Sequence, residues 1–231
     1  MLILFDIDGT LLIKASTEHA QGVLAAIREV WDIEIGDLPP MRAAGRTDLD
    51  IAREILLSAG VGNAAFDARS DAFQAASLRH CELTIPADLS ERRAPGALDV
   101  VTALGADPAH RLSLVTGNLE PIARIKLASA GLGAWFAPGQ GGFGSDAEDR
   151  DALPPIARQR AGEAWNGGER WERSQTVVVG DTPRDIACAR ADGVHVVAVP
   201  TGPYGTDELA DADAVIASLH ELPAALATLP R

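Results

Sequence analysis

The chain has 231 residues, of which 47% are hydrophobic and 23% charged, and its formal net charge is −13. This length allows one α/β domain with a small insertion, and the negative charge argues against nucleic acids and anionic membranes as partners. Cys81 and Cys188 are too far apart to indicate a zinc site, and no apolar run is long enough to span a bilayer. We therefore expect a cytoplasmic protein, as a monomer or a homodimer.

The first twelve residues, MLILFDIDGTLL, place two carboxylates directly after a short buried strand. Residues 1–5 form an apolar run typical of a central strand in a parallel sheet, and Asp6, Asp8, Gly9 and Thr10 follow at its carboxyl end. Ligands bind at this edge of an open α/β sheet. Two carboxylates at this spacing repel each other in a partly dry site, so we expect a positive charge between them.

Residues 17–81 read as helical without strand-like alternation, which indicates an insertion after the first strand. A first helix carries apolar residues at spacings of three and four, and a Gly- and Pro-containing segment at 32–40 ends it. A second helix is predicted from residues 47–48 to Gly60, and a third over residues 64–79.

The sheet resumes after residue 95 with alternating helical and apolar segments. An alternation of this kind is typical of a parallel sheet covered by helices on both faces. The further strands are expected at residues 112–115, near Phe136, and at residues 176–179, 195–199 and 214–217.

Polar residues follow two of these later strands. Residues 116–118, Thr-Gly-Asn, come after the second strand, and Asn118 is the expected N-cap of a helix that carries Lys126. After the fourth strand, Asp181 and Asp185 flank the start of another helix, for which Asp181 or Thr182 is the expected cap. One acidic residue at a helix start is explained by the helix dipole, but paired acidic residues after two buried strands are not.

These motifs together resemble the haloacid dehalogenase superfamily in its phosphatase-like branch. The resemblance rests on the DxDGT run that ends at Thr10, the Thr-Gly-Asn turn, and the Gly-Asp-Thr-Pro-Arg-Asp sequence at residues 180–185. It implies an α/β fold with a Rossmann-like three-layer parallel sheet, formed by residues 1–15 and 85–231. Residues 16–84 would form an inserted helical cap that covers the active site.

By this resemblance, Asp6 is the nucleophile and Asp8 the general acid and base. The implied cofactor is Mg²⁺, which prefers oxygen ligands and would be held by Asp6, Asp8 through its backbone carbonyl, and Asp181. Asp185 would support this site. The Thr116 hydroxyl would bond a phosphate oxygen, and further substrate or phosphate contacts are expected from Gly9, Thr10, Gly117, Asn118 and, in the Gly-Arg-Thr-Asp loop of the cap, Arg46.

The family's third motif, a lysine followed by proline, is absent from this sequence. The corresponding region reads Asp149, Arg150, Asp151, and two residues compete for the role of phosphate-neutralising cation. Spacing favours Arg150 at the start of a helix, whereas isolation on an otherwise apolar helix favours Lys126.

The resemblance implies a Mg²⁺-dependent phosphomonoester hydrolase that acts on a small phosphorylated metabolite through an aspartyl-phosphate intermediate. Asp8 argues against dehalogenation, and the absence of lysine from residues 17–81 argues against phosphonate cleavage. A phosphomutase of the same superfamily and a non-catalytic binding protein of the same fold are the alternatives.

Overall fold

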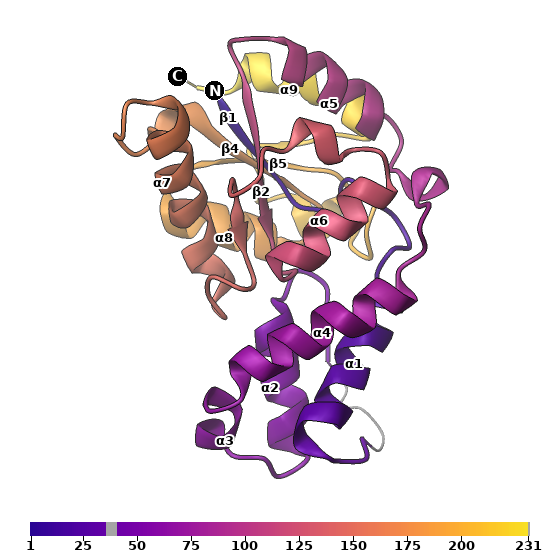
Figure 1. The fold of residues 1–231 in the computed structure, drawn as a ribbon. Coiled ribbons are helices and arrows are strands. Elements are labelled where there is room, and N and C mark those ends of the chain that lie inside the picture. Colours follow the sequence, from indigo (N-terminus) through magenta and orange to yellow (C-terminus); the bar gives the residue numbers. More distant parts are fainter. Residues whose placement is uncertain (36–40, 231) are drawn as a thin grey trace.

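The computed structural model describes residues 1–35 and 41–230. Its centre is a six-stranded sheet in which all neighbouring strands are parallel, in the order β3-β2-β1-β4-β5-β6 (Figure 1). The fold is therefore α/β, as predicted. The strands are β1 (Leu2–Phe5), β2 (Arg111–Thr116), β3 (Gly142–Phe143), β4 (Thr176–Gly180), β5 (His195–Ala198) and β6 (Ala214–Val215).

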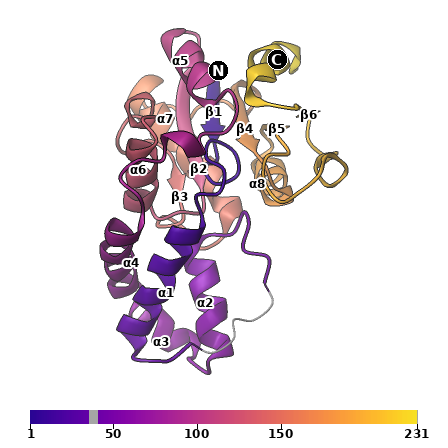
Figure 2. The same cartoon turned by 90° about the vertical axis from the view of Figure 1, so that its right-hand side faces the viewer.

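Helices cover both faces of the sheet, which explains why the strands are continuous apolar runs. Side chains of β1 alternate between two hydrophobic clusters: Ile3 and Phe5 pack with α5, α6 and α9, whereas Leu2 and Leu4 pack with α7 and α8. Figure 1 shows α7 and α8 on one side of the sheet and α5 and α6 on the other, and Figure 2 shows the same strands from a direction turned by 90°. The three layers follow from this alternation. These helices are α5 (Ala97–Ala106), α6 (Glu120–Ser129), α7 (Leu153–Trp165), α8 (Pro183–Asp192) and α9 (Leu222–Thr228).

Four further helices form a separate group beyond the carboxyl end of β1, and we call this group the helical insert (Figure 1). Trp31, at the end of α1, stacks on Phe66 with ring centroids 5.9 Å apart and lies 6.0 Å from Phe73. These aromatic contacts hold the helices of the insert together, and the three rings belong to the same buried cluster as Ile3 and Phe5. The helices are α1 (Thr17–Trp31), α2 (Asp48–Ser58), α3 (Asn63–Asp67) and α4 (Ser70–Thr84).

Two predictions of secondary structure are wrong. The helix expected over residues 64–79 is divided into α3 and α4, and the break between them allows the rings of Phe66 and Phe73 to pack on the same indole. Phe136 is not in a strand: it packs edge-on against Phe5, and the glycine-rich segment after it supplies β3 instead. The expected break at 32–40 lies partly outside the described residues, which omit 36–40.

Short 3₁₀ helices join many of these elements. The one that bears on the site is η3, which comes just before α7. They are η1 (Ser90–Arg92), η2 (Gly133–Trp135), η3 (Arg150–Ala152), η4 (Arg173–Gln175), η5 (Thr206–Leu209) and η6 (Leu219–Glu221).

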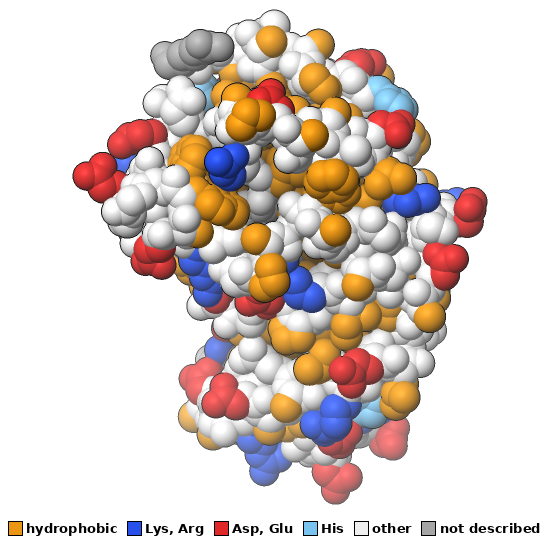
Figure 3. Space-filling model, turned by 45° about the horizontal axis from the view of Figure 1, so that its top comes forward, with side chains coloured by type: hydrophobic (Ala, Val, Ile, Leu, Met, Phe, Trp, Pro, Cys, Tyr) orange, Lys and Arg blue, Asp and Glu red, His pale blue; other side chains and the backbone are white. Residues whose placement is uncertain are grey.

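The surface mixes side chains of different kinds. Acidic, basic and hydrophobic groups are interspersed over the face shown in Figure 3. Within residues 1–35 and 41–230, every helix falls short of the length and hydrophobicity that crossing a bilayer requires.

Candidate active site

The strand order brings acidic residues from distant parts of the sequence together. Because β1 pairs with β4, Asp6 after the first strand lies beside Asp181 after the fourth. Asp185 joins them from the first turn of α8, and carboxylate oxygens of all three lie within 4.8 Å of one another. All three side chains are buried. We call these residues the carboxylate cluster.

The start of α8 fixes the position of Asp185. Thr182 is the N-cap, one of the two predicted caps: its hydroxyl accepts a hydrogen bond from the backbone of Asp185, whose carboxylate in turn accepts one from the Thr182 N–H at 2.9 Å. Pro183 occupies the first turn, where its missing N–H has no cost. This capping box directs the second oxygen of Asp185 toward Arg150, which lies 2.5 Å away.

Arg150 supplies positive charge to the cluster from η3. Its guanidinium is buried and lies 3.2 Å from Asp6 and 2.5 Å from Asp185. Arg150 is therefore the cation beside the expected nucleophile, whereas Lys126 lies beside Asp8. One guanidinium against three carboxyl groups leaves an excess of negative charge.

That excess shifts the protonation of the cluster. Burial, together with the negative charge of Asp185, raises the pKa of Asp181 to about 9, and burial raises that of Asp6 to about 7 despite the charge of Arg150. One oxygen of Asp181 accepts a hydrogen bond from Thr10 at 3.0 Å, while the other is buried without a partner. Unpaired carboxylate oxygen in an acidic pocket is the environment that a hard divalent cation prefers, so these residues fit a metal.

The turn after β1 approaches the cluster so closely that it requires glycine. Gly9 has φ of +92°, and a Cβ at this position would lie 2.1 Å from an oxygen of Asp181. The next residue, Thr10, uses its hydroxyl to hold Asp181, which differs from the expected phosphate contact.

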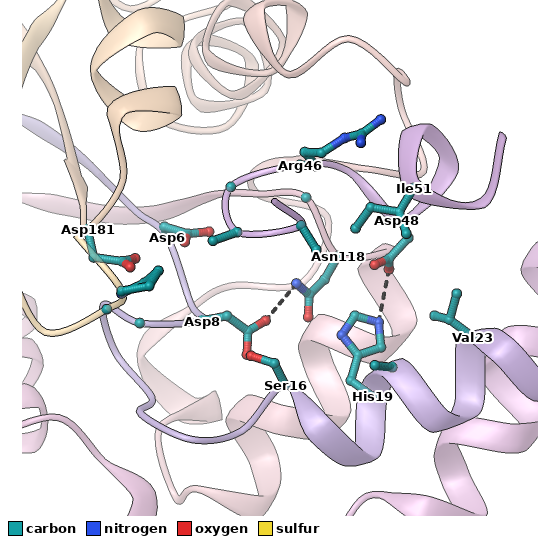
Figure 4. A pocket seen from close by; sticks show the side chains of 18 of the residues that line it. Asp6, Asp8, Ser16, His19, Val23, Arg46, Asp48, Ile51, Asn118 and Asp181 are labelled. Carbon is teal, nitrogen blue, oxygen red and sulfur yellow. Dashed lines mark hydrogen bonds and ion pairs between the residues drawn. The ribbon is translucent and has the colours of Figure 1, made fainter. Parts of the chain in front are cut away.

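A second polar cluster surrounds Asp8 and joins the sheet edge to the helical insert. Lys126 is fully buried, and its ammonium group lies 2.6 and 2.8 Å from the Asp8 oxygens. It also lies 2.9 Å from Asn118 Oδ1 and 3.1 Å from His19 Nδ1. The other ring nitrogen of His19 lies 3.1 Å from Asp48, a contact that Figure 4 marks with a dashed line. Asp8, Lys126, Asn118, His19 and Asp48 thus form one network, in which Asp8 is partly exposed at the cavity and the other four are buried.

This network favours the ionised form of Asp8. Burial alone opposes ionisation, but the positive charge of Lys126 outweighs it and holds the pKa of Asp8 below its ordinary value. Asn118 adds a hydrogen bond of 2.9 Å to the same carboxylate. The Asn118 side chain therefore binds Asp8 and Lys126 and does not cap α6. The N-cap of α6 is Leu119, so the prediction of Asn118 as the cap is wrong.

The turn after β2 contacts the insert through its backbone. Thr116 is buried and its hydroxyl accepts a hydrogen bond from the Asn118 N–H at 3.4 Å, whereas Gly117 lines the cavity. The Asp48 N–H donates to the Gly117 carbonyl at 2.8 Å, and a Cβ on Gly117 would lie 2.0 Å from the Arg46 carbonyl. Glycine is required here for the insert to approach the sheet.

The Arg46 guanidinium is occupied within the insert. It pairs with Asp50 at 2.5 Å and also with Glu54, both on α2, and Figure 4 shows its side chain extending away from Asp6. The structure therefore does not bring this charge to the carboxylate cluster, although Arg46 lines the edge of the cavity.

A cavity of about 850 Å³ separates the insert from the sheet edge. Its lining includes Asp6, Asp8, Arg150 and Asp181 on the sheet side. His19 also lines it, and sequence reasoning gave that residue no role because a lone histidine on a helix carries no spacing signal. Its place depends on how α1 packs against the sheet edge.

Comparison with known proteins agrees with this arrangement. The family model described as haloacid dehalogenase-like hydrolase matches residues 3–190. Three solved structures are similar in fold: a hydrolase from Pseudomonas syringae (18% identity, TM-score 0.67, 99% of each chain covered), a haloacid dehalogenase-like hydrolase from Streptococcus pneumoniae (16%, 0.63, 97% of each), and a beta-phosphoglucomutase from Clostridium difficile (13%, 0.65, 96% of this chain and 92% of that chain).

The comparison with curated proteins gives no match. At these identities the solved structures show the fold alone, whereas the family model covers most of the sequence. The matched residues include the strands and turns that supply the carboxylate cluster and the network around Asp8. This chain therefore belongs to the haloacid dehalogenase-like hydrolases.

Proposed function

We propose that the chain is a Mg²⁺-dependent phosphomonoester hydrolase whose nucleophile is Asp6. The observation that carries this proposal is the position of Asp6, beside Arg150 and Asp181 at the cavity. An anionic carboxylate attacks an anionic phosphate ester only where positive charge offsets the repulsion. We assign that role to Arg150, because Lys126 is bound to Asp8 instead.

A divalent cation fits the unpaired oxygen of the carboxylate cluster. Asp6, the Asp8 backbone carbonyl and Asp181 would hold Mg²⁺, and Asp185 would support the site through Arg150 and Thr182. When bound, the ion would neutralise negative charge on the phosphate and on the carboxylates.

The chain's own residues then divide the reaction into two steps. Asp6 attacks phosphorus and forms an aspartyl-phosphate, while Asp8 gives a proton to the departing alcohol oxygen. The negative charge of an incoming phosphate raises the pKa of Asp8, which favours its protonation for this step. After the alcohol leaves, the ionised form that Lys126 stabilises accepts a proton from the water that hydrolyses the intermediate.

The helical insert would act as a cap over these steps. We propose residues 16–84 as the cap and residues 1–15 and 85–231 as the catalytic core. The contact between Gly117 and Asp48 closes one side of the cavity, and such closure limits the entry of water. A cavity of this size accommodates a small phosphorylated metabolite.

Asp6→Asn tests the proposal directly. The variant should keep its circular dichroism spectrum and lose release of phosphate from p-nitrophenyl phosphate in the presence of Mg²⁺, because the amide is a poor nucleophile. The matched control is Asp99→Asn on α5, at the opposite end of the sheet from the insert, which should retain full activity (Figure 1). Normal turnover by Asp6→Asn would show that another residue is the nucleophile.

Product analysis separates hydrolysis from the phosphomutase alternative. A hydrolase releases free phosphate from a sugar phosphate, whereas a mutase returns an isomeric sugar phosphate. Isomerised product without free phosphate would replace the hydrolase proposal by the mutase.

A further inference from the structure

The cavity wall that faces the carboxylates is apolar. Among the described residues, the insert and the segment leading into it contribute a group of aliphatic and thioether side chains to the lining, and Figure 4 labels Val23 and Ile51 of this group. Val23 and Ile55 are buried, and the others are partly buried. This apolar wall consists of Ile13, Val23, Leu24, Met41, Ile51 and Ile55.

The polar side chains of the insert that reach the cavity already have partners in the protein. His19 uses one ring nitrogen with Lys126 and the other with Asp48. The Arg46 guanidinium is paired with two acidic side chains of α2. Lys14 is exposed to solvent, so a group that it binds stays hydrated. The wall therefore offers a bound molecule apolar contact but few free hydrogen-bonding groups.

This distribution discriminates between classes of leaving group. A hydroxylated group placed against the apolar wall loses hydrogen bonds to water and finds no replacement. An apolar group gains free energy because its surface leaves water. Resting on the proposed function, we infer that the preferred substrate is a phosphate monoester of an apolar alcohol, alkyl or aryl, rather than a sugar phosphate.

Two esters of matched shape test this inference. Cyclohexylmethyl phosphate and glucose 6-phosphate each carry a primary phosphate on a six-membered ring and differ in the ring oxygen and hydroxyl groups. The electron-withdrawing oxygens of glucose make its alcohol the better leaving group, so a preference for the cyclohexyl ester reports on the wall. We expect kcat/KM to be at least about tenfold higher for cyclohexylmethyl phosphate. Equal or higher kcat/KM for glucose 6-phosphate would overturn the inference.

Methyl phosphate distinguishes failure of this inference from failure of the proposed function, because its methyl group is too small to depend on the apolar wall. If the protein hydrolyses methyl phosphate but prefers the sugar ester, the phosphatase proposal stands and the inferred preference for apolar alcohols is refuted. If none of the three esters is hydrolysed in the presence of Mg²⁺, the proposed function and the inferred substrate class are both refuted.

Substitutions in the wall locate the effect. Ile51→Asn should reduce the preference for cyclohexylmethyl phosphate over glucose 6-phosphate by about fivefold or more. Leu57→Asn on the same helix is the control: Leu57 is 46% exposed, does not line the cavity and should leave the ratio unchanged. Val23→Thr keeps the side-chain shape and adds one hydroxyl, and it should also lower the ratio. An unchanged ratio in both wall variants would contradict the assignment.

Discussion

Asp181→Asn tests the charge imbalance of the carboxylate cluster in the absence of metal. Three buried carboxyl groups share one guanidinium there, and burial raises the pKa of Asp181 to about 9. Asparagine keeps an oxygen acceptor for the Thr10 hydroxyl and removes the ionisable group. We therefore expect the variant to be more stable than the wild type in EDTA at neutral pH, although it loses a proposed metal ligand.

The magnitude follows from the difference in proton affinity between the folded and unfolded chain. Asp181 binds its proton more tightly when folded, so its contribution is most favourable below the unfolded pKa of about 4 and is lost as the pH rises toward 9. At about 1.4 kcal/mol per pH unit, the upper limit of this loss at pH 7 is about 4 kcal/mol. Asp6 titrates in the same cluster, and its protonation relieves part of the repulsion. We therefore expect the substitution to raise the free energy of unfolding at pH 7 by about 2 kcal/mol.

Urea unfolding followed by circular dichroism at pH 7 and pH 4, in EDTA, measures this difference. The stability gain of Asp181→Asn should be present at pH 7 and close to zero at pH 4, where the wild-type carboxyl is protonated. Asp99→Asn, with an exposed carboxylate, should show no such pH dependence. A variant less stable than the wild type at pH 7, or an equal gain at both pH values, would refute the reasoning.

Magnesium should reverse the order of stability. A ligand that binds only the folded state stabilises it by about 2.7 kcal/mol at a hundred times its dissociation constant. The wild type should gain on this scale when Mg²⁺ replaces EDTA, whereas Asp181→Asn should gain little because one carboxylate ligand is missing. Equal stabilisation of the two proteins by Mg²⁺ would show that Asp181 is not a ligand.

Two buried cations give further predictions. Lys126→Met removes the buried counter-ion of the partly exposed Asp8 carboxylate and should lower the free energy of unfolding by about 2 kcal/mol, whereas Lys14→Met, at an exposed position, should change it by less than about 0.5 kcal/mol. Arg158→Met uncouples a pair in which both oxygens of Asp192 are bound at 3.0 and 3.1 Å, and a loss of about 3 kcal/mol is expected. Arg160→Met on the same helix, whose pair is more exposed, should cost about 1 kcal/mol or less. In each pair, equal urea midpoints for the buried and control variants would count against the prediction.

The α/β fold could be predicted from sequence because buried parallel strands require continuous apolar segments. Residues 112–115 and 176–179 lie in β2 and β4 as expected, and Thr182, one of two candidate caps, begins α8. These features depend on neighbouring residues alone. The strand expected near Phe136 failed because β3 has only two residues, one of them glycine, and so has no pattern of its own.

The sequence by itself determined which acidic residues follow the first and fourth strands, since each strand end is a local feature. Only the tertiary structure decided which positively charged side chain lies beside each acidic residue. Arg150 lies beside Asp6, and Lys126 beside Asp8, because β1 sits between β2 and β4 and because long side chains reach across the sheet edge. Spacing along the chain cannot specify such pairs, since they depend on distances and burial that exist only after the strands and the insert have packed.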